Sequence, residues 1–99
     1  MKKVKSITVI GRKWFDRVNG NTYHTAQIMV NGETVGNIPF SYGYDSMYEQ
    51  NASTWLKENG YIKSDKNEYI QLSRYCRENG IHFESFAQYY PRKKDIINP

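Results

Sequence analysis

Cations and aromatic rings are interleaved in one short stretch of the chain, residues 12–17, which reads RKWFDR. Surfaces that bind nucleic acid combine these residue types, because cations attract phosphate and aromatic rings stack on bases. We therefore take Arg12, Lys13, Trp14 and Arg17 as candidate binding residues. In the alternative interpretation, one ring enters the core, the other packs across neighbouring strands, and the cations between them are simply exposed to solvent.

A second group of aromatic residues lies further along the chain and consists of Phe40, Tyr42, Tyr44 and Tyr48. Exposed tyrosines are common in contact surfaces, because the ring is apolar and the hydroxyl is polar. Tyr42 and Tyr44 are therefore candidate binding residues, for a protein or for nucleic acid. Packing between a sheet and the first helix would explain the same residues without any partner.

The sequence contains no phosphate-binding loop, no dinucleotide fingerprint and no nucleophile elbow. Its single cysteine, Cys76, and its two histidines, His24 and His82, match no metal-ligand spacing. Cys76 lies on an apolar stripe, where a free cysteine behaves as a small hydrophobic residue. We expect a protein that binds a partner, is not an enzyme, and uses neither a metal nor a cofactor.

The net charge of +4 is unevenly distributed along the chain. Lysine and arginine are concentrated in residues 1–17 and 90–99, whereas the middle is mildly acidic. Basic ends of this kind can contact phosphate. They also keep a small domain soluble, so the charge pattern is compatible with both roles.

The length of 99 residues is that of a single domain. The hydrophobic fraction of 38% lies above the range of disordered chains. The N-terminus lacks the apolar stretch of a signal peptide, no segment resembles a membrane helix, and the lone cysteine fits a reducing compartment. We predict one cytoplasmic domain over residues 1–99, in which residues 91–99 form a loose basic tail that Ile96 and Ile97 could anchor.

Alternating side chains predict three strands, at residues 4–18, 22–30 and 34–42. The first strand is expected to bend or bulge at Gly11. Asn19-Gly20 and Asn31-Gly32 separate the strands, and Asn-Gly favours the positive φ angles of tight hairpin turns. Pro39 cannot donate a ladder hydrogen bond, so the third strand should lie at an edge. The pattern predicts an antiparallel meander in the order 1-2-3.

Two helices are predicted after the meander. The first begins at a capping box formed by Ser46 and Glu49 and ends at Asn59-Gly60. The second runs from residue 66 to residue 78 and ends at a similar Asn-Gly pair, residues 79–80. Its start is expected to be capped by Ser64, or by Asp65 together with Glu68.

These elements predict an α+β fold, in which a three-stranded antiparallel meander carries two α-helices packed on one face. Residues 81–90 follow, either as a possible fourth strand or as an irregular segment packed on the helices. Trp55 shares the apolar stripe of the first helix with Ala52 and Leu56, so it should seat that helix on the sheet.

Three stretches of the sequence resemble small accessory proteins encoded by phages and prophages: GNTYH at 20–24, VNG at 30–32 and PFSYGY at 39–44. The closing RKKDI at 92–96 is similar to the ends of that group. The resemblance covers the meander best and the second helix poorly. No function is established for the group, so it assigns no site residues. It implies a phage-derived protein that is made in the cytoplasm of a bacterial host.

Small phage proteins often act by binding and blocking a host component, including defence complexes such as CRISPR effectors. The resemblance therefore implies a non-enzymatic inhibitor whose partner is a host protein complex. The alternative is a small basic protein that binds nucleic acid with the face of its meander. In that case Arg12, Lys13 and Arg17 would contact phosphate, helped by the basic residues at 92–94. Neither interpretation includes a membrane or a metal.

Overall fold

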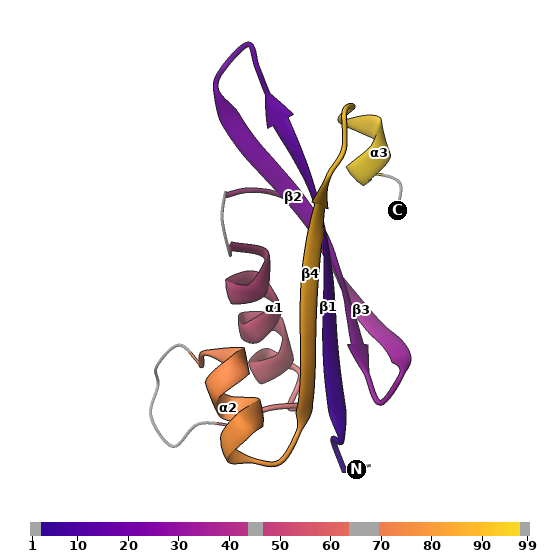
Figure 1. Ribbon diagram of the computed structural model, residues 1–99, viewed down its shortest axis with the longest axis vertical. Helices are drawn as coiled ribbons and strands as arrows, with labels where there is room; N and C mark the ends of the chain where they lie inside the picture. Colours follow the sequence, from indigo (N-terminus) through magenta and orange to yellow (C-terminus); the bar gives the residue numbers. More distant parts are fainter. Residues whose placement is uncertain (1–2, 44–46, 64–69, 98–99) are drawn as a thin grey trace.

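Four strands form one sheet in the order β3-β2-β1-β4 (Figure 1). The computed structural model describes residues 3–43, 47–63 and 70–97. The strands are β1 (Ser6–Asp16), β2 (Asn21–Val30), β3 (Glu33–Tyr42) and β4 (His82–Tyr89). The first three pair antiparallel in chain order, which confirms the predicted meander and places β3 at an edge.

The two hairpin turns of the meander differ. Asn31 and Gly32 have φ angles of 53° and 82°, so this turn is the predicted tight one. The first turn is longer than predicted, because β1 ends at Asp16 and residues 17–20 form the connection. The Asp16 carboxylate accepts hydrogen bonds from the backbone N–H of Val18 and from the amide of Asn19, which holds the chain in a turn before the Asn-Gly pair.

The first strand passes straight through Gly11, contrary to the predicted bend. Its register with β2 is unbroken at this position. A Cβ atom at residue 11 would lie 2.7 Å from a ring carbon of Tyr48. Glycine is therefore explained here by the close approach of a helix side chain and not by a bulge.

Residues 82–89 form a fourth strand and not an irregular segment, the two alternatives that the sequence left open. This strand, β4, pairs parallel with β1, so the complete sheet is mixed. A parallel pair needs a crossover connection of about a dozen residues or more, and the helical segment between β3 and β4 provides it.

Helices α1 (Met47–Glu58) and α2 (Leu72–Glu78) lie on one side of the sheet, as predicted (Figure 1). The core between them and the sheet is aliphatic, with Ile7, Val9, Ile28, Leu56 and Leu72 almost fully buried. The predicted capping residue Ser46 lies outside the described residues. Glu49, its predicted partner, accepts a hydrogen bond from the hydroxyl of Ser85 on β4.

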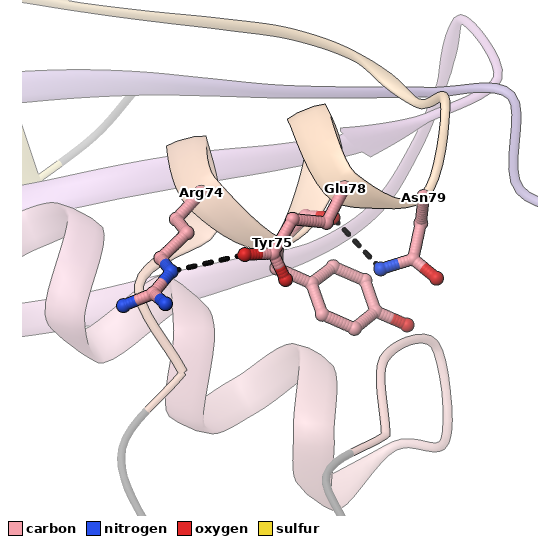
Figure 2. A network of polar contacts seen from close by, with 4 residues as sticks. All are labelled: Arg74, Tyr75, Glu78 and Asn79. Atoms are coloured by element: carbon pink, nitrogen blue, oxygen red, sulfur yellow. Dashed lines mark hydrogen bonds and ion pairs between the residues drawn. The ribbon is translucent and has the colours of Figure 1, made fainter.

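Both of these helices stop at Asn-Gly, as predicted. After α1, the N–H of Tyr61 donates to the carbonyl of Leu56, and Gly60 takes a φ of 80°. This is the Schellman arrangement, which satisfies carbonyl groups at a helix end. At the end of α2, Asn79 also donates its side-chain amide to the carbonyl of Tyr75, next to the exposed Arg74–Glu78 ion pair (Figure 2).

The start of α2 at Leu72 is later than the predicted residue 66. Gln71 has an extended backbone, with ψ at 114°, so the helix cannot include it. The carbonyl of the buried Ile70, just before this helix, accepts a hydrogen bond from the hydroxyl of Ser53 on α1. The predicted caps Ser64, Asp65 and Glu68 lie outside the described residues.

The segment expected as a loose tail contains a short helix, α3 (Lys94–Ile97), on the other side of the sheet (Figure 1). Ile96 is fully buried, and its carbonyl accepts a hydrogen bond of 2.9 Å from the hydroxyl of Thr25 on β2. One apolar side chain and one buried hydrogen bond therefore fix this segment to the sheet. Among the described helices, none is long and apolar enough to cross a membrane.

Candidate functional site

Four aromatic side chains lie side by side on the sheet face that α1 and α2 leave uncovered. We call this group, Trp14, Tyr23, Phe40 and Tyr42, the aromatic face. The ring centroids of Trp14 and Tyr23 are 5.9 Å apart, and those of Tyr23 and Phe40 are 4.9 Å apart, both in stacked geometry. The ring of Tyr42 meets Tyr23 edge-on at 5.7 Å. Three strands thus contribute to one continuous set of rings.

Strand alternation explains most of this arrangement. Trp14 is the direct cross-strand partner of Tyr23, and Tyr23 is the partner of Tyr42. The neighbouring residues Lys13 and His24 point to the opposite face, where they contact side chains of α1. Because successive side chains of a strand alternate between faces, the three rings share the face away from that helix.

Phe40 reaches the aromatic face through an irregularity of β3. Ile38 pairs with Ala26 and is buried under α1, so regular alternation would place Phe40 on that face too. The register shifts between His24 and Ala26, where Pro39 and Phe40 together face a single residue of β2. Such a bulge turns the following side chains to the other face of the sheet. Phe40 consequently stacks on Tyr23.

Cations border the aromatic face. The ammonium of Lys93 lies 5.1 Å from the ring centroid of Phe40, and the guanidinium of Arg12 lies 5.6 Å from that of Tyr90. Both distances are within the range of cation–π attraction. Arg12 also donates a hydrogen bond of 3.5 Å to the carbonyl of Asp95, which links it to α3. Lys93 therefore borders the rings directly, and Arg12 lies on the same face because it is two residues from Trp14 on β1.

Asp16 is a negative group near these cations. Its pKa is lowered, first by the hydrogen bond from the Asn19 side chain, and to a smaller degree by further backbone bonds and the charge of Lys93. This carboxylate stays ionised near neutral pH and is occupied by the turn that follows β1. The basic character of the region then rests on Arg12, Lys93 and the exposed Lys94, while Arg92 lies 3.5 Å from the Asp95 carboxylate in an ion pair.

The candidate binding residues from the sequence do not all lie together. Arg12, Trp14 and Tyr42 lie on or beside the aromatic face. Lys13 lies on the opposite side and is only 8% exposed, with its ammonium 5.3 Å from the ring of Tyr48 and 5.5 Å from that of Tyr89. Tyr44 lies outside the described residues.

Arg17 lines a separate groove at the end of the sheet, with a volume of about 360 Å³. The groove is lined by Phe15, Arg17, Tyr89, Tyr90 and Pro91. Tyr90 connects it to the aromatic face, because its ring contacts Arg12 and its backbone N–H donates to the carbonyl of Lys13. Neither Trp14 nor Phe15 joins the main core, whereas Trp14 packs across strands on Tyr23, as the alternative interpretation expected of one ring.

Sequence reasoning missed Tyr23. It grouped Phe40 with Tyr42 and named residues 92–94 as helpers in phosphate contact, but it did not place Phe40 and Lys93 on one face with Trp14. Tyr23 could have been placed on the face of Trp14, because a tight turn at Asn19-Gly20 and the observed longer turn differ by two residues in register and so keep the same faces. The longer turn makes the two residues direct partners. A hairpin register counted from Asn31-Gly32 places Phe40 on the face of Tyr23, and the two register shifts in β3 together retain that face. Lys93 depends on the docking of α3, which leaves no local sequence signal.

A buried histidine, His24, connects β2 to the start of α1. Its Nδ1 lies 3.2 Å from the carbonyl oxygen of Gly43, and its Nε2 lies 2.8 Å from the amide nitrogen of Asn51. A neutral ring that donates from Nδ1 and accepts at Nε2 satisfies both partners. Burial, as the largest cause, lowers the pKa of His24, and the charge of Lys13 lowers it further against the opposing bond to Gly43.

We expect the fold to lose stability when the pH falls from about 7.5 to about 5, because the unfolded chain takes up the His24 proton first. The contribution is complete above the ordinary pKa of 6.5 and decreases as the pH falls below it, since the folded-state pKa is the lower one. Chemical denaturation at several pH values would measure this. The exposed His82 provides the control: His82→Gln should keep the pH dependence, and His24→Gln should remove most of it. An equal dependence in both variants would contradict the prediction.

No group of three or more His, Cys, Asp or Glu side chains within the described ranges is arranged to hold a metal ion. Cys76 is buried between α2 and the sheet, and this burial raises the pKa of its thiol to about 11. The thiolate form, which is the nucleophile, is therefore scarce near neutral pH.

Comparison with known proteins finds no matching family model, no matching curated protein and no matching solved structure. The resemblance to phage accessory proteins therefore stays a prediction. Within the described residues, the aromatic face brings stacked rings and a cation together on one surface.

Proposed function

We propose that this protein binds single-stranded nucleic acid on the aromatic face. One observation carries the proposal: rings from three adjacent strands meet on the sheet face opposite α1 and α2, with Lys93 over one ring and Arg12 two residues from Trp14 on the same strand. This is the combination that single-strand binding proteins use, namely aromatic platforms for bases and cations along the backbone path.

The rings offer favourable contacts to unpaired bases. Tyr42 is 58% exposed, while Trp14, Tyr23 and Phe40 are each partly exposed. Stacking of one base on an aromatic ring contributes about 1–3 kcal/mol and depends little on base identity. Bases of a duplex are already stacked and paired, so a sheet face of this kind favours single strands.

The cations supply the second part of the binding energy. Lys93 and Arg12 lie beside the rings, and Arg92 and Lys94 are exposed on the same C-terminal segment. Each phosphate that such groups neutralise releases condensed counterions, so affinity falls as salt rises, with a slope of about −0.7 per phosphate for single strands.

Fluorescence anisotropy with labelled single-stranded DNA and RNA of mixed sequence tests the proposal. We expect Tyr42→Ala to weaken binding about 5- to 150-fold, the equivalent of one lost stacking contact, and Tyr42→Phe to bind like the parent because it keeps the ring. Lys93→Ala should reduce the salt slope by about 0.7. Lys5→Ala, which changes an exposed lysine just before β1, should leave the slope unchanged. Absence of binding at low salt, or equal affinity for Tyr42→Ala and the parent, would overturn the proposal.

A host protein complex, the partner implied by the phage resemblance, is the alternative. Exposed aromatic rings also suit protein contacts. A pull-down from a bacterial lysate after nuclease treatment separates the two, because a protein partner would be recovered in near-stoichiometric amount and a nucleic-acid-bridged one would be lost.

A further inference from the structure

The outer side of β4 is an open sheet edge. This strand pairs with β1 on one side, and no described strand pairs with the other. In Figure 1, β4 passes in front of β1, with α1 and α2 to one side and α3 to the other. An uncovered edge presents unpaired backbone N–H and C=O groups that fit another strand.

The two edges of the sheet differ in how they are protected. β3 carries Pro39 and two register shifts, features that hinder the addition of a further strand. β4 reads HFESFAQY and contains no proline, lysine or arginine. Its register with β1 is unbroken from His82 to Tyr89. The edge of β4 is therefore regular, eight residues long and suited to pairing.

The hydrogen bonds to β1 determine which groups of β4 point outward. The N–H of His82 donates to the carbonyl of Lys5, and the N–H of Tyr90 donates to that of Lys13. Even-numbered residues of β4 thus direct their backbone groups to β1. Because these groups alternate sides along a strand, the odd-numbered residues direct theirs to the open edge. They are Phe83, Ser85, Ala87 and Tyr89.

We propose that β4 pairs antiparallel with β4 of a second copy of this chain, about a twofold axis at Phe86. In this register Phe83 lies opposite Tyr89 and Ser85 lies opposite Ala87, so every outward-facing residue meets another outward-facing residue. Such pairs exchange two backbone hydrogen bonds each. The two sheets then form one continuous sheet across the dimer.

The side chains favour this register over its neighbours. It places Phe86, which is 52% exposed, opposite Phe86 of the second copy. It also places Phe83 opposite Tyr89, which is 60% exposed. Aromatic cross-strand pairs of this kind stabilise a sheet. A shift that centres the axis on Glu84 would oppose two carboxylates, and a shift that centres it on Ser85 would place Phe83 opposite Ala87. The twofold at Phe86 alone pairs aromatic rings on both faces.

Sedimentation equilibrium across a range of protein concentrations tests the dimer. We expect the parent to form dimers, Phe86→Lys and Phe86→Asp to be monomers when alone, and an equimolar mixture of these two variants to associate again through opposite charges at the axis. Asn37→Lys, at an exposed residue of β3 on the opposite edge of the sheet, should still dimerise. Circular dichroism would verify that each variant is folded. A monomeric parent at all concentrations, a dimeric Phe86→Lys, or no association in the mixture would overturn the proposal, and each outcome is independent of nucleic-acid binding.

Discussion

Replacing Trp55 with alanine is expected to lower the free energy of unfolding by about 3–5 kcal/mol, which is typical for truncating a packed tryptophan. Trp55 lies against Gly36 on β3 and stacks on Tyr61 with centroids 5.9 Å apart. It therefore joins α1 to the edge strand of the meander. A small domain has only about 5–15 kcal/mol of stability in total, so thermal and chemical denaturation should both detect a large loss.

Gly36→Ala is the matched control for this contact. A Cβ atom at residue 36 would lie 2.2 Å from a ring carbon of Trp55, so the ring or the strand must shift. We expect this variant to be destabilised by about 1–3 kcal/mol, and much less so in a Trp55→Leu background, where the ring is absent. Equal losses in the two backgrounds would show that the two residues are not coupled. A Trp55→Ala protein that melts like the parent would contradict the structural role of Trp55.

Replacing Ile96 with alanine is expected to cost about 2–5 kcal/mol, the usual range for a buried isoleucine. This side chain is fully buried and fixes α3 to the sheet, where the hydroxyl of Thr25 also donates to the Ile96 carbonyl. The neighbouring Ile97 is 43% exposed, so Ile97→Ala should change stability by less than about 0.5 kcal/mol. Urea denaturation of the two variants compares adjacent isoleucines in one segment.

Similar stabilities for Ile96→Ala and Ile97→Ala would mean that α3 contributes little to the fold. The two variants should also differ in nucleic-acid binding, because Lys93 immediately precedes α3 and contacts Phe40. A loosened α3 should weaken nucleic-acid binding and its salt dependence together, even though Ile96 itself is buried. Ile97→Ala should retain both.

The division of the sheet into two faces explains how a chain of this size can have both a core and a binding surface. α1 and α2 cover one face and bury the aliphatic residues there. α3 is too short to cover the other face, which leaves rings partly exposed beside its basic residues. The apolar rings on that face are thus available for contact and not required for the main core.

The sequence alone determined the elements that depend on neighbouring residues. Alternation specified the meander strands, Asn31-Gly32 specified a tight turn, and the Asn-Gly pairs specified where two helices stop. These features follow from local backbone preferences and side-chain spacing, which act over a few residues. Trp14 and Tyr42 are predicted as binding candidates from residue type alone, because aromatic residues among cations and clustered tyrosines are typical of contact surfaces.

Tertiary structure decided the rest. The parallel direction of β4, the burial of Lys13 between two rings and the docking of Ile96 all join segments distant in the chain. The two register shifts of β3 arise only when this strand is aligned against β2. Such contacts depend on which surfaces remain uncovered after the meander and the helices have packed, and no local pattern contains that information.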